Sequence, residues 1–342
     1  MANGHLQRLG FLTIGLFDPD DPRPGHESTL EVIELGEQLG FDSAWVRHRH
    51  LQHGVSSPVA LLAAATQRTR HIELGTAVIP LGWENPLRLA EDLATVDVLS
   101  GGRLQPGISV GPPTHWDDVK KSLYPDTWED EDFTYERIER LLHHLGGGRA
   151  SDFAGVEGIE TYSARVEPHV PDLASRVWQG AAGLGSVRWA AERGLNLLSS
   201  NLVRAEDDDD FDRVQRSHID TFRAHHRDPS RGRVSQGRVV IPTDSATPEQ
   251  VAKYQAYVDS RLPRTHAPQG PGRILFSTDL IGPAASIADQ LHTTLSYRAV
   301  DEVVFALPFT FDHDDYVQIL TDIATRLGPE LGWSPTAHPA GA

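Results

Sequence analysis

The chain has 342 residues and a formal net charge of -17 at pH 7, and it contains 0 Cys. This negative charge repels nucleic acid and anionic lipid, so neither is an expected partner. The lack of cysteine excludes disulfides, thiolate metal sites and a cysteine nucleophile. Because no apolar run approaches the ~18 residues of a membrane span, we expect a cytoplasmic protein without membrane contact.

Strand and helix patterns alternate along the chain. The clearest unit covers residues 71–111, where a short run rich in β-branched residues ends at Pro80, a helix with Leu87, Ala90 and Leu93 at helical spacing follows, and a second strand comes next. Eight strands are predicted, at residues 9–17, 41–46, 71–79, 103–110, 176–179, 195–199, 238–241 and 301–307. Helices are predicted at residues 29–39, 58–67, 86–99, 133–145, 186–193, 211–225 and 315–327, and a less regular helical region covers residues 248–291.

Eight βα units in a chain of this length predict an α/β fold, a TIM (β/α)8 barrel with loop insertions. We expect a single domain over residues 1–342, with its core at about residues 9–327. A doubly wound parallel sheet is the alternative, because periodicity does not show whether a sheet closes. Barrel enzymes carry their sites at the C-terminal ends of the strands, so the residues just after each strand are the candidates for function.

The segment after the second strand, residues 47–53, is the densest cluster of histidine and arginine in the chain. His48, His50 and His53 could ligate a metal, but no pair of Asp or Glu lies nearby in the sequence to complete such a site, so no metal is expected. Histidine titrates near neutrality, which favours general acid or base catalysis, or contact with an anion. A polar loop without a catalytic role is the alternative.

A glycine-rich turn follows the fifth strand. Gly180, Gly183 and Gly185 allow the backbone to approach a ligand closely, and Ser186 stands where a helix begins. Because the N-terminus of a helix favours negative charge, the turn is a candidate phosphate site. The spacing matches neither a Rossmann fingerprint nor a P-loop, and a tight turn that needs glycine for geometry alone is the alternative.

Two longer segments are candidate walls of a binding site. Residues 111–132 form a long connection that carries Trp116, Tyr124 and Trp128, and these aromatic side chains suit an apolar or aromatic substrate. Residues 262–273 are rich in proline and glycine, which indicates a mobile lid or, equally, a disordered insertion without a role.

Five motifs together give the chain a family resemblance. They read FDSAWVRHRH at residues 41–50, GTAVI at 75–79, NPLRLAED at 85–92, LSGGRL at 99–104 and WAAERGL at 189–195. In this order they resemble the bacterial-luciferase-like flavin monooxygenases, over roughly residues 9–327. The resemblance implies a TIM barrel that binds reduced FMN, or in a related branch the deazaflavin F420, at the C-terminal ends of the strands.

The resemblance also implies roles for individual residues. Ala77 and Val78 match a pair joined by a non-prolyl cis peptide against the flavin ring, and Ser109 falls where luciferases carry a cysteine near the flavin. Arg137 lies near a phosphate-binding arginine of the family. The residues that match the phosphate-binding turn are Gly183, Leu184, Gly185 and Ser186.

The chain departs from the family after the second strand. Luciferases carry two adjacent histidines there, the first of them catalytic, and alignment on Trp45 puts Arg49 at the first place and His50 at the second. The chemistry could move to His50 or His48, or Arg49 could stabilise an anion by its fixed charge.

The implied activity is oxygenation by a flavin. Reduced FMN from a separate reductase would react with O2 to give a C4a-peroxyflavin, which would oxygenate a small apolar or aromatic metabolite, as in natural-product tailoring. The alternatives are an F420-dependent dehydrogenase or reductase on the same fold and a non-catalytic flavin-binding protein. A homodimer formed through the helices after the second and third strands is expected from the same resemblance.

Overall fold

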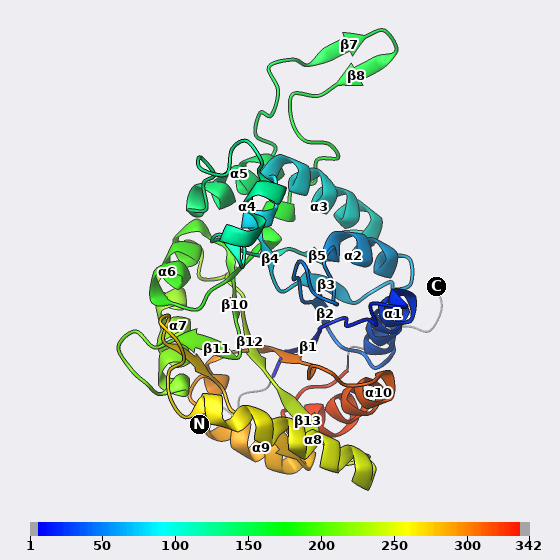
Figure 1. The fold of residues 1–342 in the computed structure, drawn as a ribbon, viewed down its shortest axis with the longest axis vertical. Helices are drawn as coiled ribbons and strands as arrows, with labels where there is room; N and C mark the ends of the chain where they lie inside the picture. Colours follow the sequence, from blue (N-terminus) through cyan, green and yellow to red (C-terminus); the bar gives the residue numbers. More distant parts are fainter. Residues whose placement is uncertain (1–5, 336–342) are drawn as a thin grey trace.

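A ring of parallel strands forms the centre of the computed structural model, which describes residues 6–335 (Figure 1). Hydrogen bonds join its ten segments in the order β4-β6-β9-β10-β12-β16-β1-β2-β3-β5. The segments are β1 (Arg8–Thr13), β2 (Ser43–Val46), β3 (Glu73–Thr76), β4 (Ile79–Pro80), β5 (Leu104–Gln105), β6 (Gly107–Ser109), β9 (Trp178–Gly180), β10 (Asn196–Ser199), β12 (Val234–Arg238) and β16 (Glu302–Ala306).

The ring is closed. The strand order has two ends only because two of the eight strands are each interrupted once and so appear as two segments. β3 and β4 are successive parts of one strand, separated by the cis peptide Ala77–Val78, and β5 and β6 flank Pro106, which has no N–H to donate. β3 pairs with β5, and β4 pairs with β6. The two ends of the strand order are therefore neighbours, and the predicted TIM barrel is confirmed over a doubly wound sheet.

Helices surround the barrel on its outer side (Figure 1). Most of them follow a strand, and four have proline as their first residue, where no N–H donor is needed. None of the described helices is long and apolar enough to cross a membrane. They are α1 (Pro22–Gln38), α2 (Pro58–Thr66), α3 (Pro86–Ser100), α4 (Trp116–Leu123), α5 (Tyr135–Leu145), α6 (Leu184–Arg193), α7 (Phe211–His225), α8 (Pro248–Arg261), α9 (Ala284–Thr293), α10 (His313–Asp322) and α11 (Gly328–Glu330).

The seventh strand was predicted in the wrong place. The barrel strand is β12, which shares only Arg238 with the predicted run at residues 238–241. The last two residues of that run belong to β13 (Val240–Pro242), which pairs outside the barrel with β15 (Leu280–Gly282). The apolar residues at 239–241 are typical of a buried strand and therefore favoured a strand at this place. β12 has a polar sequence. Its Gln236 has buried polar partners, since it donates to Gln215 Oε1 at 2.7 Å and to Ser296 Oγ at 2.8 Å.

The irregular region at residues 248–291 is two helices with an insertion between them. After α8 come a short 3-10 turn (Leu262–Thr265), the strand β14 (Ile274–Phe276) and β15, and α9 then begins. β14 pairs antiparallel with β11 (Leu202–Arg204). The predicted lid, residues 262–273, is thus a connection between α8 and a small sheet, while its mobility stays a prediction.

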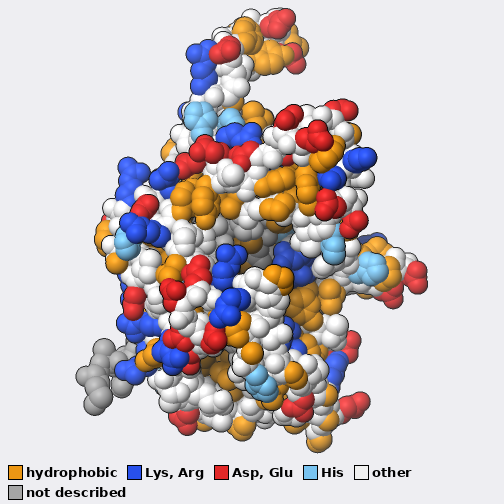
Figure 2. Space-filling model, turned by 60° about the vertical axis from the view of Figure 1, so that its left-hand side comes forward, with side chains coloured by type: hydrophobic (Ala, Val, Ile, Leu, Met, Phe, Trp, Pro, Cys, Tyr) orange, Lys and Arg blue, Asp and Glu red, His pale blue; other side chains and the backbone are white. Residues whose placement is uncertain are grey.

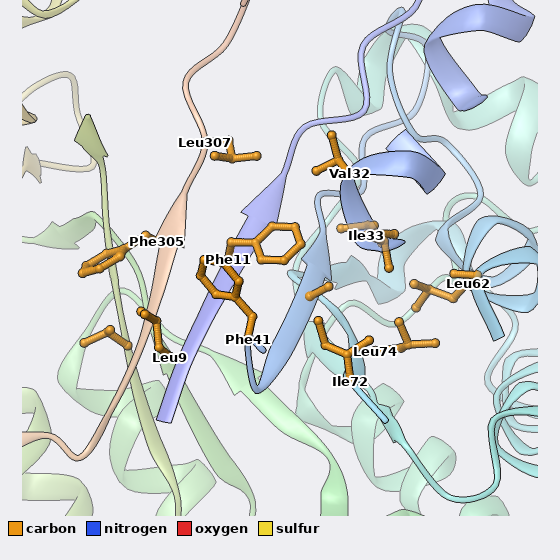
Figure 3. Close-up of a cluster of buried hydrophobic side chains, with 14 of the residues drawn as sticks. Leu9, Phe11, Val32, Ile33, Phe41, Leu62, Ile72, Leu74, Phe305 and Leu307 are labelled. Carbon is orange, nitrogen blue, oxygen red and sulfur yellow. The ribbon is translucent and has the colours of Figure 1, made fainter. Parts of the chain in front are cut away.

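The main core lies between the strands and the helices (Figure 3). Phe11 and Phe41 meet edge to face with ring centroids 5.2 Å apart, and Leu62 and Leu74 bring α2 against β3. Other members shown there are Leu9, Val32, Ile33, Ile72, Phe305 and Leu307, all of them buried. These contacts fix the helices around the barrel and so hold the ends of the strands in place.

A second, smaller cluster fills the inside of the barrel. Trp45 and Trp178 are fully buried, and their rings meet edge to face at 5.4 Å. Each indole N–H has a partner, Ser43 Oγ for Trp45 and Gln105 Oε1 for Trp178, both at 2.9 Å. The barrel is therefore a packed core at this level and not a pore.

An ion network lies at the end of the barrel where the strands begin. Arg8 contacts Glu73 at 2.7 Å, and Arg233 contacts Glu73 at 3.0 Å and Glu302 at 2.9 Å. The Arg233 guanidinium also lies over the Trp178 ring, 4.8 Å from its centroid. The network therefore contacts Trp178 directly through Arg233.

One insertion leaves the barrel entirely. The strands β7 (Gly155–Glu157) and β8 (Glu160–Tyr162) form an antiparallel hairpin that projects away from α3 and α5 (Figure 1). This agrees with the prediction of a barrel with loop insertions. Of the single domain predicted over residues 1–342, residues 1–5 and 336–342 lie outside the described residues.

Candidate active site

A cavity of about 390 Å³ opens at the C-terminal ends of the barrel strands, where the sequence predicts the site. Leu12, Val78, Leu198 and Val304 line it from four strands, and they pack against the tryptophan pair below. The floor of the cavity is therefore apolar, and rigid elements position it. Polar groups enter from the rim, through the loops that follow the strands.

The cis peptide predicted between Ala77 and Val78 is present, and both residues line the cavity. Gly180 lies next to Val78, since a Cβ atom on Gly180 would come within 2.9 Å of Val78 Cγ1. The absence of a side chain at Gly180 thus leaves room for the side chain of Val78. Ser109 ends β6 and pairs with Pro80, but it does not reach the described lining of the cavity.

The residues after β2 alternate between two sides of the chain. Arg47 and Arg49 line the cavity, while His48 and His50 do not. His48 is buried and forms a 3.0 Å hydrogen bond between its Nε2 and the Ser56 carbonyl oxygen. Of the predicted catalytic residues, the structure therefore brings only Arg49 into the cavity.

Both histidines are held uncharged at neutral pH. Burial, and then the neighbouring His50, lower the pKa of His48 from 6.5 to about 3. Burial also lowers the pKa of His50, whose ring stacks on Trp83 with centroids 4.2 Å apart. A neutral imidazole can donate or accept a hydrogen bond, but it supplies no fixed charge.

Sequence reasoning missed an acidic neighbour of these histidines. A ring nitrogen of His48, a ring nitrogen of His50 and a carboxylate oxygen of Glu84 lie within 4.8 Å of one another. Burial raises the pKa of Glu84. Glu84 is distant from these histidines along the chain, because it comes from the loop after the third strand. The expected absence of a metal stays a prediction.

The glycine-rich turn begins α6 and borders the cavity through Ala181 and Ala182. The Leu184 N–H donates to Glu206 Oε2 at 2.8 Å, and the Ser186 hydroxyl donates to the Gly183 carbonyl oxygen at 2.9 Å. The positive end of the helix thus already contacts a carboxylate. A phosphate could bind the Leu184 N–H only if the Glu206 side chain moved away.

Arg137 is saturated by protein acceptors. Its guanidinium donates to the carbonyl oxygens of Leu81, Glu84 and Asp132 at 2.7, 2.9 and 2.9 Å, and to Glu131 at 3.0 Å. The side chain is buried, so these bonds anchor the long connection onto the β4–α3 loop. Its predicted contact with a phosphate stays a prediction and would require some of these bonds to break.

The three predicted substrate aromatics lie outside the described lining of the cavity. Trp116 packs against Phe133 with ring centroids 4.8 Å apart, and the Tyr124 hydroxyl donates to the Gly82 carbonyl oxygen at 3.0 Å. Trp128 lies under the Lys120 ammonium, 4.2 Å from its ring centroid. These residues stabilise the long connection, and their contact with a substrate stays a prediction.

Two further arginines line the cavity and were not predicted. Arg261 ends α8, and Arg264 belongs to the turn that opens the predicted lid. The composition of this segment suggested a lid, but the direction in which an arginine points does not follow from composition. Phe276 of β14 lines the cavity beside them.

Comparison with known proteins gives a consistent family. Residues 8–302 match the model of the luciferase-like monooxygenases. The chain is 30% identical over 193 residues to limonene 1,2-monooxygenase of Rhodococcus erythropolis, covering 52% of this chain and 49% of the relative. It is 28% identical over 187 residues to F420-dependent glucose-6-phosphate dehydrogenase 2 of Rhodococcus jostii, covering 52% and 54%. The chain thus spans about half the length of these curated relatives.

A solved structure shares the fold. The oxygenating constituent of 3,6-diketocamphane monooxygenase from Pseudomonas putida, in complex with FMN, superposes with a TM-score of 0.64 over 95% of this chain and 98% of that one. The two sequences are 14% identical, so this likeness concerns the fold alone.

Proposed function

We propose that this chain, which belongs to the luciferase-like monooxygenase family, is a flavin-dependent monooxygenase that uses reduced FMN and O2 to oxygenate a small, mainly apolar organic molecule. One observation carries the proposal. The cavity at the strand ends is walled by the cis-linked Ala77 and Val78, the pair that the family resemblance assigns to the flavin ring. A separate reductase would supply the reduced flavin.

The described residues fit a flavin ring better than they fit its phosphate. Ala77, Val78 and Gly180 offer a wall without bulky side chains, against which a flat ring can lie. The phosphate would bind at the turn of Gly183 to Ser186, where Glu206 now contacts the Leu184 N–H and would have to be displaced. When bound, the reduced flavin supplies the activation of O2.

The chain itself would exclude water, orient the substrate and manage charge. Apolar residues at the cavity floor keep bulk water from the reacting groups. Arg49 would place a fixed positive charge beside a developing anion. His50, with His48 as the second candidate, stays the proposed proton donor, a role that would require its neutral ring to take up a proton and to turn toward the cavity, which it does not line.

The test is an anaerobic titration with reduced FMN and, separately, with reduced F420, followed by mixing with oxygenated buffer. We expect tighter binding of reduced FMN and oxygen-dependent flavin oxidation that a substrate accelerates. Gly180→Val should abolish flavin binding, because the new side chain would collide with Val78 and displace this wall of the cavity. A folded Gly180→Val variant that binds reduced FMN normally would contradict this placement.

Hydride transfer with F420 is the second candidate, because an F420-dependent dehydrogenase matches half of the chain. Tight binding of reduced F420, with no oxygen-dependent spectral change, would favour this candidate over the monooxygenase.

A further inference from the structure

Four arginines gather on the rim of the cavity. Arg47 and Arg49 come from the loop after β2, and Arg261 and Arg264 come from the end of α8 and the turn after it. Figure 2 shows Lys and Arg side chains on both sides of the hollow at the centre of that face. Two segments far apart in the sequence therefore bring like charges to one opening.

Three of these arginines have no ion-pair partner among the described residues, although the charge of Asp279 also acts on Arg264. Arg261 forms an ion pair with Asp279, but Arg47, Arg49 and Arg264 have no carboxylate within ion-pair distance in the described part of the chain. Among the described residues that line the cavity there is no Asp or Glu. A chain with a net charge of -17 has acidic residues in excess, so their absence from this opening is a local feature.

Two of the unpaired arginines, Arg47 and Arg264, are also partly withdrawn from water, whereas Arg49 is exposed. The Nε atom of Arg264 is buried without a hydrogen-bond partner. Burial, together with the positive charge of Arg49, lowers the pKa of Arg47 from 12.5 to about 10. Partly desolvated cations that repel one another destabilise a folded protein unless an anion offsets them.

Aromatic rings hold two of the guanidinium groups. Arg47 lies over Phe309, 5.2 Å from the ring centroid, and Arg264 lies over Phe276 at 4.3 Å. Stacking of this kind orients the guanidinium plane and leaves its N–H edge free, which suits bidentate binding of a carboxylate or phosphate. Arg47 gives one N–H to Gln52 Oε1 at 3.1 Å, and Arg49 gives one to the His48 carbonyl oxygen at 3.3 Å.

We propose that Arg47, Arg49 and Arg264 bind an anionic group, and that this group is the carboxylate of an otherwise apolar substrate. The apolar floor would hold the body of the molecule, and the arginines at the rim would hold its charged end. The assignment of this anion to a substrate rests on the proposed function, but the anion site itself does not. The same chemistry would suit a phosphate of the cofactor, so the experiment separates the two sources.

The first measurement is calorimetric titration of the protein, without cofactor, with 2-naphthoate and with 2-naphthamide, which differ by a carboxylate and a neutral amide. We expect 2-naphthoate to bind at least ten-fold more tightly, and the preference to shrink at high salt. Arg49→Gln and Arg264→Gln should each weaken 2-naphthoate binding roughly ten-fold or more without affecting 2-naphthamide. Equal affinity for both ligands would overturn the proposal.

Two controls make the result specific. Arg298→Gln removes an exposed charge that does not line the cavity, so it should leave 2-naphthoate binding unchanged. If this variant lost as much affinity for 2-naphthoate as Arg49→Gln, the effect would come from net charge alone and the proposal would be overturned. Arg49→Lys keeps the charge and should retain part of the affinity. Near-ultraviolet circular dichroism identifies any variant that fails to fold, and Arg264→Gln tests the proposal from the other loop.

A parallel titration with FMN and riboflavin distinguishes the two sources of anion. If the arginines serve the substrate, Arg49→Gln and Arg264→Gln will leave the ratio of FMN to riboflavin affinity unchanged. A collapse of that ratio, with 2-naphthoate binding intact, would assign the arginines to the cofactor and overturn the substrate assignment. If neither flavin binds while 2-naphthoate does, the proposed function fails and the anion site stands.

Discussion

Replacing Arg137 by methionine tests whether this residue supports a loop or binds a cofactor. The side chain is buried, and it donates to the carbonyl oxygens of Leu81, Glu84 and Asp132 and to the carboxylate of Glu131. Methionine has a similar length, so it fills most of the volume and removes mainly the hydrogen bonds. The variant therefore isolates the polar contribution of Arg137.

The expected loss of stability follows from the acceptors left behind. Each buried acceptor without a partner destabilises by about 1–3 kcal/mol, and such effects do not add fully within one network. Some carbonyl groups will recover water where the loop opens. We therefore expect Arg137→Met to lower the free energy of unfolding by about 3–5 kcal/mol, a range typical of breaking a buried charged network.

Guanidinium chloride unfolding of Arg137→Met and of a matched control gives the comparison. Arg140→Met changes an exposed arginine on the same helix, and it should shift the free energy of unfolding by less than about 0.5 kcal/mol. A second titration measures FMN binding to each variant under native conditions. If Arg137→Met were as stable as the wild type but bound FMN poorly, the residue would be a phosphate ligand and the structural reasoning would be refuted.

Two further predictions concern pH and packing. The pKa of His48 is lowered from 6.5 to about 3, so between these pH values the unfolded chain binds a proton at His48 that the folded chain does not. The contribution of His48 to the free energy of unfolding is therefore complete above pH 6.5 and falls by about 1.4 kcal/mol per pH unit below it. The stability difference between the wild type and His48→Gln should therefore change by about that amount between pH 7.5 and 5.5, as measured by urea unfolding. Gly75→Ala would place a Cβ atom 2.2 Å from the buried ring of Trp45, so denaturant unfolding should show a loss of about 1–3 kcal/mol or more.

Each of these predictions has a simple control. The His48→Gln variant should lose the pH dependence assigned to this group, and an unchanged dependence of stability on pH in that variant would contradict the assignment to His48. At Gly272 an added Cβ atom would make only ordinary contacts, at 3.7 Å or beyond, so Gly272→Ala should be near neutral. Equal effects of alanine at Gly75 and Gly272 would show that the barrel interior yields more readily than its packing implies.

The fold could be predicted largely because alternating strands and helices are a local signal. Seven of the eight strands were predicted close to their positions, and the exception, β12, has a polar sequence that carries no such signal. Ser235 and Gly237 face the cavity, while Gln236 on the other side of the strand bonds to Gln215 and Ser296, and all of these contacts are made with other parts of the chain. Closure of the barrel was likewise invisible, because it depends on pairing between interrupted strands.

The site was predicted less well, since it depends on the direction of each side chain. The sequence placed a functional cluster after β2, but it could not show that Arg49 faces the cavity while His48 faces away. Glu84 and Arg264 join from other loops, and nothing in their local sequence marks them. Ala77 and Val78 were found because the family resemblance named them, and periodicity alone would not have done so.

The ion network where the strands begin affects where ligands can enter and leave the barrel. Arg8, Glu73, Arg233 and Glu302 seal that end of the barrel, and Trp178 lies directly above them. Under the proposed function, flavin, substrate and product would then enter and leave at the opposite end, where the cavity opens. Whichever molecule lies deepest has to arrive first and leave last, so the architecture imposes an order of events on the catalytic cycle.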